Sequence, residues 1–567
     1  MRVFLGLSLW LSFAAGAWGQ SYPVKIESAV AVKMRDGTLL IADVYRPQAD
    51  GKFPVLLQRT PYNRAGGAAG AAEMSSHGYV VVLQDTRGRF DSRGEFYPFR
   101  YESQDGYDTV EWAAALPYSS GEVGMFGGSY VGATQMLAAM ARPPHLAAVF
   151  PYVTASEYYE GWTYQGGALM QWFASSWASS LAVDTLRRKA ADISNPKEWV
   201  AQLPIEDYRL LELPGAGVAP YFRDWVAHER DDEYWRPWKI SDHYSEMTVK
   251  ALHAGGWNDI FLKGTIRNFV GMRRASPAAA GQRLLLGPWA HASISPEGKI
   301  GDVTFGKQAV LDHTATALRW FDYALKGVRN EYATGAPVRI FVMGENVWRE
   351  EQEFPLARTR DTNYYLRGGA LGAAPPGDDP PDSYEYDPAN PVPSIGGRLC
   401  CANHQLPPGP ADERPNESRP DVVVFSTPPL EKDLEVTGFI RAKIYASSSA
   451  VDTDFTAMLT DVDSSGYSRF LTDGIVRARY RNSTTKAEPI EPGKIYEYDI
   501  DLWATSNVFQ AGHRIRLAIS SSNFPRFNRN LNTGEAAAGA TGMLKATQKI
   551  YHDAAHPSAL VLPVIPR

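Results

Sequence analysis

The sequence has little cysteine, no long apolar run beyond its first residues and no surplus of basic residues. Only two of its 567 residues are cysteine, Cys400 and Cys401, and adjacent cysteines pair with each other only in a strained ring. A disulfide framework of the kind that supports small secreted domains is therefore excluded. The fold must rest on hydrophobic cores, and a chain of this length, 44% hydrophobic, has enough material for several domains.

Basic charge and metal-ligand motifs are also scarce. Lys and Arg total 57 against 63 for Asp and Glu, a formal net charge of −6, so we expect no nucleic-acid partner. There is no H-E-x-x-H motif, and the adjacent cysteines have no partners at the spacing of metal ligands. We therefore expect no metal and no cofactor.

The longest apolar run lies at the N-terminus. Arg2 is followed by an apolar stretch over residues 3–15 and by small residues that end at Gly19. This pattern predicts a secretory signal peptide over residues 1–19, cleaved before Gln20. The run is shorter than the ~20 apolar residues that a membrane-spanning helix needs. We expect an exported protein, periplasmic or extracellular, without a membrane span, and the sequence predicts no particular oligomeric state.

Alternating strand-like and helix-like segments fill residues 20–153 and return over residues 249–360, which predicts one α/β catalytic domain made of the two blocks. The expected elements of the first block are a hairpin over residues 22–45, buried strands at 54–62 and 79–88, a helix at 105–116, and a strand and helix within 121–141.

Between the two blocks, residues 154–248 are rich in Trp and Tyr at helical spacing, which predicts a helical cap over the active site. Residues 364–426 are punctuated by Pro and Gly and are expected to form a linker or a wrapping segment. Short strand-like runs with turns between them follow. We expect residues 361–567 to form a C-terminal all-β domain, a jelly roll.

The segment Gly121–Ala141 contains the candidate nucleophile, Ser129. A short strand, a Gly-Gly-Ser-Tyr turn and a helix are typical of a nucleophile elbow, which needs small residues where strand and helix approach each other. Gly127, Gly128 and Gly132 meet this need, but the common G-x-S-x-G pattern is not matched, because its second glycine comes one residue late. From this motif alone, an ordinary turn serine remains the alternative.

A serine hydroxyl needs a base and a group that orients the base, and in α/β-hydrolases the acid and then the histidine follow the serine. Of eleven histidines, His291 directly follows a strand-like run, whereas His253 lies inside an apolar strand and His313 begins a helix. Asp259 ends the preceding strand, where its alternative role is a helix N-cap. We predict that Ser129, His291 and Asp259 act together.

The tetrahedral intermediate of acyl transfer also needs hydrogen-bond donors for its oxyanion. We expect one donor to be the backbone N–H of Tyr130, the residue after the nucleophile. The second candidate is the phenol of Tyr62, which follows a predicted strand. Its alternative role is packing against the adjacent loop.

Several motifs in one order resemble a known family of serine hydrolases. They are Arg-Thr-Pro-Tyr (59–62), Gln-Asp-Thr-Arg-Gly (84–88), Gly-Gly-Ser-Tyr-Val-Gly (127–132), Gly-Gly-Trp-Asn-Asp (255–259) and Gly-Pro-Trp-Ala-His (287–291). The chain resembles the family of cocaine esterase, X-Pro dipeptidyl-peptidases, glutaryl-type cephalosporin acylases and α-amino acid ester hydrolases. The resemblance implies an α/β-hydrolase core with an inserted helical cap and a C-terminal jelly roll. It also implies a Ser129–Asp259–His291 triad and an oxyanion hole formed by Tyr62 and the Tyr130 amide.

The substrate is less determined by the sequence. Four aromatic residues are expected to line the pocket: Trp162, Trp172, Phe173 and Phe261. A substrate with an α-ammonium group would require carboxylates near the serine, and the candidates are Glu157, Glu160 and the cluster Asp231-Asp232-Glu233. Because no distinctive acidic signature is present, our first hypothesis is hydrolysis of a small-molecule ester or acyl amide through an acyl-enzyme. The alternatives are an X-Pro dipeptidyl-peptidase, an α-amino acid ester hydrolase and, more remotely, an inert carbohydrate-binding protein.

Overall fold

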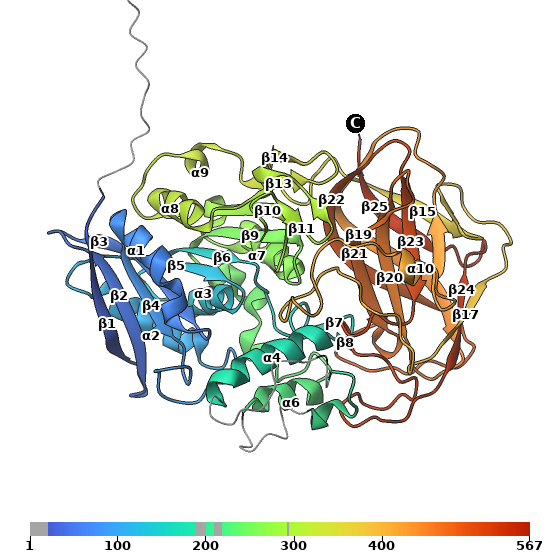
Figure 1. Cartoon of the computed structure of the whole chain (residues 1–567), viewed down its shortest axis with the longest axis horizontal. Coiled ribbons are helices and arrows are strands. Elements are labelled where there is room, and N and C mark those ends of the chain that lie inside the picture. The colour runs from blue at the N-terminus through green and yellow to red at the C-terminus, as the bar shows by residue number, and fades with distance from the viewer. Residues whose placement is uncertain (1–20, 187–196, 198–199, 209–217, 292–293, 567) are drawn as a thin grey trace, which may run out of the picture.

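The computed structural model describes residues 21–186, 197, 200–208, 218–291 and 294–566 (Figure 1). The expected signal peptide, residues 1–19, lies outside this range. Within the described part, none of the helices combines the length and the apolar character needed to cross a membrane. An α/β domain forms the N-terminal half of the molecule and an all-β domain the C-terminal half.

The N-terminal domain is built on a ten-stranded sheet. The strands from β4 to β13 run parallel to their neighbours, whereas the two edges are antiparallel. In spatial order the strands are β1 (Val24–Lys33), β2 (Leu39–Pro47), β4 (Val80–Asp85), β3 (Phe53–Thr60), β5 (Ser119–Gly128), β6 (Leu146–Tyr152), β9 (Lys250–Asn258), β10 (Gln282–Ala290), β13 (Val338–Val342) and β14 (Val347–Glu351). The predicted hairpin and buried strands of the first block are confirmed.

Helices cover both faces of this sheet, because successive side chains of a buried strand point to opposite sides. In β3, Val55 and Leu57 share a core with α2 and α3, whereas Leu56 shares the opposite core with α1 and α8. The helices of this domain are α1 (Ala68–Ser76), α2 (Glu102–Ala114), α3 (Tyr130–Ala141), α7 (Leu262–Ala275), α8 (His313–Ala324) and α9 (Glu331–Thr334), and a short hairpin, β11 (Lys299–Ile300) and β12 (Val303–Thr304), precedes α8.

The segment between β6 and β9 lies at the junction of the two domains (Figure 1). Its described elements are mainly helical, as expected: α4 (Gln171–Thr185), α6 (Pro220–Ala227) and the 3-10 turns Ile205–Asp207, Arg236–Trp238 and Ile240–Glu246. A short hairpin with two residues in each strand, β7 (Tyr164–Gln165) and β8 (Ala168–Leu169), was not expected. It contacts the C-terminal domain, where Arg477 donates its backbone N–H to the carbonyl of Gly166 at 2.9 Å.

The C-terminal domain consists of eleven strands, which confirms the expected all-β character. Most neighbours are antiparallel, and the longest pair is β19 with β22. The strands are β15 (Arg360–Arg367), β16 (Ala370–Gly372), β17 (Asp382–Tyr386), β18 (Val423–Ser426), β19 (Leu434–Ser448), β20 (Asp454–Val462), β21 (Ser468–Arg477), β22 (Tyr496–Phe509), β23 (Arg514–Ser520), β24 (Ala546–Tyr551) and β25 (Ala559–Ile565), and one short helix is α10 (Arg414–Glu417).

The interpretation of residues 364–426 as a linker or wrapping segment is wrong in part. The strands β15 to β18 belong to the C-terminal sheet, and β15 pairs with β25 while β17 pairs with β24. These strands are short and their partners lie far along the chain, so the Pro and Gly residues between them dominate the local pattern. Only the stretch between β17 and β18 wraps, and it reaches the α/β domain.

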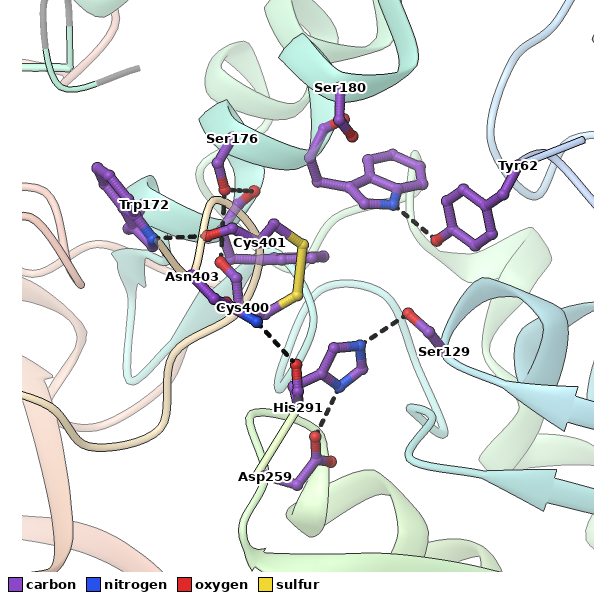
Figure 2. The surroundings of a disulfide bond; sticks show 12 residues. Tyr62, Ser129, Trp172, Ser176, Ser180, Asp259, His291, Cys400, Cys401 and Asn403 are labelled. Atoms are coloured by element: carbon purple, nitrogen blue, oxygen red, sulfur yellow. Dashed lines mark hydrogen bonds and ion pairs between the residues drawn. A yellow bond between two sulfur atoms is a disulfide. The ribbon is translucent and has the colours of Figure 1, made fainter. Parts of the chain in front are cut away.

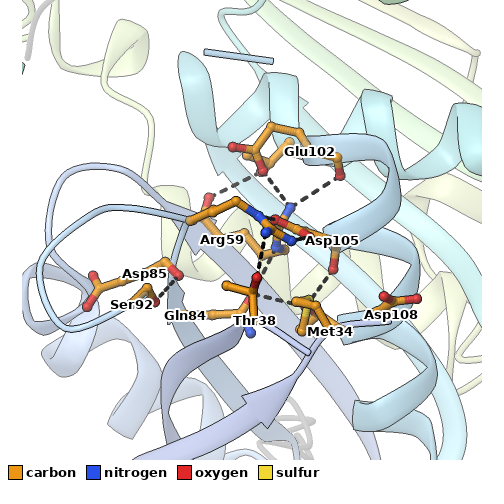
Figure 3. Close-up of polar contacts among 12 residues, drawn as sticks. Met34, Thr38, Arg59, Gln84, Asp85, Ser92, Glu102, Asp105 and Asp108 are labelled. Carbon is orange, nitrogen blue, oxygen red and sulfur yellow. Dashed lines mark hydrogen bonds and ion pairs between the residues drawn. The ribbon is translucent and has the colours of Figure 1, made fainter. Parts of the chain in front are cut away.

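A buried polar network lies behind the turn between β5 and α3 (Figure 3). Arg59, at the end of β3, is fully buried and donates from Nε to Gln84 at 2.9 Å and from Nη1 to Glu102 at 2.6 Å. The second oxygen of Glu102 accepts from the Tyr130 hydroxyl at 2.9 Å. The hydroxyl in turn accepts from the backbone N–H of Phe99 at 2.9 Å. The first residue of α3 is therefore tied to β3 and α2 by groups that are shielded from water.

This network generates a stability prediction. Glu102→Gln removes the closest carboxylate from the buried Arg59 guanidinium, and breaking a buried ion pair on one side leaves an uncompensated charge. We expect a loss of about 3 kcal/mol in the free energy of unfolding, measured by denaturant titration. The matched control is Glu122→Gln at the exposed start of β5, which should change stability by less than about 0.5 kcal/mol. Equal effects of the two substitutions would contradict the role given to the network.

Candidate active site

Ser129 lies in the turn between β5 and α3 with a backbone conformation that non-glycine residues rarely adopt. Its φ is 61° and its ψ is −128°. Such a conformation costs of order 1–3 kcal/mol and persists only where the surroundings hold it. Here the Ser129 N–H donates to the carbonyl of Tyr152 at 2.9 Å, and the Ser129 carbonyl accepts from Gly132 at 2.9 Å. The turn lifts the side chain above the carboxyl end of the sheet.

Three glycines around Ser129 are required by close contacts. A Cβ at Gly127 would meet Val131 at 2.3 Å, and a Cβ at Gly128 would meet the Tyr152 ring at 2.6 Å. A Cβ at Gly132 would meet the Thr154 side chain at 2.8 Å. The helix therefore leaves no room for a side chain at the third residue after the serine, which is where this chain has its glycine.

Ser129, His291 and Asp259 lie in one chain of hydrogen bonds (Figure 2). His291 Nδ1 lies 2.7 Å from Asp259 Oδ1, and His291 Nε2 lies 3.0 Å from Ser129 Oγ. A carboxylate only accepts, so Nδ1 carries the proton and Nε2 is free to accept from the serine. The second oxygen of the fully buried Asp259 accepts from the Phe261 N–H at 2.9 Å, just before α7. Phe261 is the N-cap residue of α7 and no side chain caps this helix, so Asp259 contacts the histidine and the turn before α7 but does not act as the N-cap weighed as its alternative role.

Tyr62 follows β3, and its hydroxyl lies beside the serine. Trp177 on α4 donates its indole N–H to that hydroxyl at 2.9 Å. Tyr62 as a whole is 40% exposed, but desolvation of its hydroxyl raises its pKa, although hydrogen bonds with Trp177, the Ser129 side chain and the Tyr130 backbone act in the opposite direction. Because an indole N–H can only donate, Tyr62 accepts from Trp177 and keeps its own proton to donate. The phenol hydroxyl thus lies close to both the Ser129 side chain and the Tyr130 backbone.

The aromatic residues predicted to line the pocket mostly form a closed wall. Trp162, Phe173 and Phe261 are at most 1% exposed and pack together, with Trp162 stacked on Phe261 at 4.2 Å between ring centroids. The edge of Phe261 meets the His291 ring at 5.0 Å between centroids. These side chains therefore support the histidine from behind.

Trp172 does not join this wall, contrary to expectation. Its ring packs in a separate small core with Val200 and Leu399. The reason is helical geometry, since neighbouring residues project about 100° apart and residues four apart share a face. Phe173 and Trp177 thus form one face of α4, and Trp172 lies on another.

The open space next to Ser129 is a cavity of about 290 Å³ that the sequence did not reveal. Its described walls contain none of the four predicted aromatic residues. They are formed by Gly128, Ser129, Tyr152, Val153, Trp289, Ala290, His291, Ile294, Leu311 and His313. The His313 ring meets Tyr152 at 4.5 Å between centroids, and burial lowers its pKa. Tyr152 ends β6, and this position at a strand end was the one feature of the sequence that could have indicated its place beside Ser129.

The carboxylates considered for binding an ammonium group are already paired. Glu157 forms ion pairs with Arg267 and, at 3.6 Å, with Lys239. Glu160 pairs with Lys263 at 2.8 Å. The members of the 231–233 cluster pair with Lys239, His228 and Arg236, respectively. None of these carboxylates is among the described walls of the cavity.

The structure also bears on His253, the histidine inside a strand, and on metal binding. His253 is fully buried in β9 and lies 3.0 Å from Gln282 through Nε2, and burial lowers its pKa to about 4. It is therefore a neutral core residue, as expected. In the described part of the chain, no group of three or more His, Cys, Asp or Glu side chains is placed to hold a metal ion.

Comparison with known proteins assigns the chain to a family. Residues 36–293 match the X-Pro dipeptidyl-peptidase family S15, and residues 330–561 match the X-Pro dipeptidyl-peptidase C-terminal non-catalytic domain. Cocaine esterase from Rhodococcus sp. (strain MB1 Bresler) is 39% identical over 579 residues, which cover 96% of this chain and 99% of that protein.

Solved structures agree with this placement. An α-amino acid ester hydrolase superposes with a TM-score of 0.81 at 25% identity, covering 98% of this chain and 100% of that one. An aminopeptidase from the marine sediment archaeon Thaumarchaeota archaeon superposes with a TM-score of 0.82 at 25% identity, covering 96% and 97%. The chain therefore belongs to the serine hydrolase family that includes cocaine esterase and the X-Pro dipeptidyl-peptidases of the S15 family.

Proposed function

We propose that this serine hydrolase cleaves an ester or acyl-amide bond of a small molecule through a Ser129–His291–Asp259 triad. The observation that carries the proposal is the continuous hydrogen-bond chain from Asp259 through His291 to Ser129 at the edge of an open cavity. A serine in this arrangement has a base within reach, and the base has a carboxylate that orients it.

In the proposed mechanism, His291 Nε2 takes the proton of Ser129 as Oγ attacks the substrate carbonyl. Asp259 stabilises the imidazolium through Nδ1. The imidazolium then gives its proton to the leaving alcohol or amine, and an acyl-enzyme remains on Ser129. Water, activated by His291, hydrolyses the acyl-enzyme and restores the serine. No metal or cofactor takes part in this sequence.

The oxyanion is held by the Tyr130 N–H and the Tyr62 hydroxyl in this proposal. The proximity of the Tyr62 hydroxyl to Ser129 and to the Tyr130 backbone supports it, as does the orientation of Tyr62 by Trp177. Donors that are fixed before the reaction stabilise developing charge without reorganising, which makes such contacts a large part of catalysis.

The finer architecture is also a proposal. We infer an α/β-hydrolase core from residues 20–153 and 249–360, a cap from residues 154–248 and a jelly roll from residues 361–567. We further propose that residues 1–19 direct export. A disulfide between Cys400 and Cys401 is compatible with an oxidising compartment.

An esterase or acylase is favoured over a peptidase that recognises a free amino terminus. Recognition of an ammonium group requires an uncompensated carboxylate, and Glu157 and Glu160 are both neutralised by cationic partners. The described walls of the cavity combine apolar side chains with Tyr152 and His313, which suits a small neutral group. Membership in a hydrolase family disfavours the inert carbohydrate-binding alternative.

The first test of the triad is Ser129→Ala. We expect hydrolysis of a short-chain p-nitrophenyl ester to fall by at least about 10³-fold in kcat, because the nucleophile is lost while the fold is retained. Absorbance of released p-nitrophenol measures the rate, and thermal unfolding checks the fold. Activity equal to that of the wild type would exclude Ser129 as the nucleophile.

The second test concerns the oxyanion donor. Tyr62→Phe removes the hydroxyl and keeps the ring, and we expect a fall of about 10²- to 10³-fold in kcat with a small change in KM. Trp177→Phe keeps the donor but removes the group that orients it, so the expected fall is smaller, about tenfold. In the double variant the two losses should not add. Additive losses would mean that Trp177 acts independently of Tyr62.

The third test separates esterase from peptidase. We expect the wild type to hydrolyse a phenyl ester of a short acyl chain with a higher kcat/KM than a Gly-Pro p-nitroanilide. Acetylation of the Gly-Pro amino group should not reduce the rate further, because the described walls of the cavity contain no carboxylate that could bind the ammonium group. A strong preference for the free Gly-Pro amide would favour the dipeptidyl-peptidase instead.

A further inference from the structure

The two cysteines of the chain are bonded to each other next to the candidate active site. They lie in the wrapping stretch between β17 and α10, and Figure 2 shows the disulfide between α4 and the His291 side chain. Cys400 is 2% exposed and shares the core that contains Trp162, Phe173 and Phe261. Cys401 is half-buried and packs against the same core. The disulfide therefore belongs to the same hydrophobic core as these aromatic residues and lies near His291.

Hydrogen bonds fix the loop 399–403 on two sides. On the side of α4, Trp172 donates its indole N–H to the Cys401 carbonyl at 3.1 Å, and Ser176 donates to the Cys400 carbonyl at 3.4 Å. On the other side, Asn403 Nδ2 donates to the backbone carbonyl of His291 at 3.5 Å. The loop thus links the face of α4 that carries Trp172 and Ser176 to the backbone of His291.

The backbone of this loop adopts a conformation that needs support. Cys401 has a φ of 67° and Ala402 a φ of 49°, and neither is glycine. Each such residue costs of order 1–3 kcal/mol and persists only when its surroundings determine it. A covalent ring between residues 400 and 401 limits the backbone to few conformations and so provides this support.

We propose that the Cys400–Cys401 disulfide is a positioning element for His291. It holds the loop 399–403 in the conformation that keeps Cys400 in the shared hydrophobic core and Asn403 on the His291 carbonyl. The inference rests on the proposed function, because it acts through His291 as the base. Opening the ring allows residues 401 and 402 to return to negative φ, and the support of His291 is then lost.

The chemistry of ring opening is simple to control. A dithiol such as dithiothreitol breaks the S–S bond, supplies two electrons and two protons to give two cysteine thiols, and is itself oxidised to a cyclic disulfide. Because Cys400 and Cys401 are the only cysteines, a dithiol has no other disulfide to reduce within the chain. Any change in activity that it causes can therefore be assigned to this bond.

The experiment distinguishes the effect of the closed ring on kcat from the effect of the space that the two sulfur atoms fill. In the wild type treated with dithiothreitol under native conditions, both sulfurs remain and the ring is lost. We expect two thiols per chain by titration with a thiol reagent and a fall of about 10- to 100-fold in kcat on the p-nitrophenyl ester, with a smaller change in KM. Reoxidation with glutathione disulfide should restore kcat.

Variants complete the design. The double variant Cys400→Ala/Cys401→Ala should have the kcat of the reduced wild type and no response to dithiothreitol. Asn403→Ala in the oxidised protein should reproduce part of the fall, because it removes only the contact with His291. Thermal unfolding of each sample checks the fold, and if the double variant does not fold, reduction and reoxidation of the wild type decide the question.

Three results would overturn the inference. The first is a reduced wild type with two thiols and an unchanged kcat. The second is a double variant with the kcat of the oxidised wild type. The third is a double variant that loses activity while the reduced wild type keeps it, since packing volume alone would then matter. Absence of ester hydrolysis by the oxidised wild type would instead overturn the proposed function itself, together with this inference.

Discussion

The arrangement around Ser129 depends on one strained residue that must be held on all sides. With φ at 61°, the turn between β5 and α3 is stable only because three glycines let the strand, the helix and the segment after β6 approach closely. The buried Arg59–Glu102 pair then fixes Tyr130, the next residue, from below. The position of the serine hydroxyl and the direction of the adjacent amide are therefore set by packing that does not involve the substrate.

The inserted segment completes the site from above, mainly through the two faces of α4. One face holds Trp177, which donates to the Tyr62 hydroxyl and so leaves the proton of that hydroxyl for the oxyanion of the proposed mechanism. The other face holds Trp172 and Ser176, which bind a loop of the C-terminal domain. One helix thus connects Tyr62, the proposed oxyanion donor, with the domain that carries no member of the proposed triad. This connection gives the C-terminal domain a physical route to the histidine.

Charge pairing favours the proposed substrate class. The family contains enzymes whose names refer to amino acid esters and dipeptides, and in this chain Glu157 and Glu160, two carboxylates considered for binding an ammonium group, are paired with Arg and Lys. A paired carboxylate gains little from a second cation, because its charge is already compensated. The cavity beside Ser129, with its largely apolar described walls, is consistent with the same substrate class.

Local sequence patterns were sufficient to predict many elements of the α/β domain and the three candidate site residues. Strand and helix periodicity predicted the elements of the α/β domain, and position at strand ends selected Ser129, Asp259 and His291, because these signals depend on neighbouring residues. The cavity beside Tyr152, the separate place of Trp172 and the pairing of Glu157 were decided by tertiary packing. So was the contact between Asn403 and His291, which are 112 residues apart. Such contacts depend on how two domains and an inserted segment meet, and no local pattern of the chain encodes that meeting.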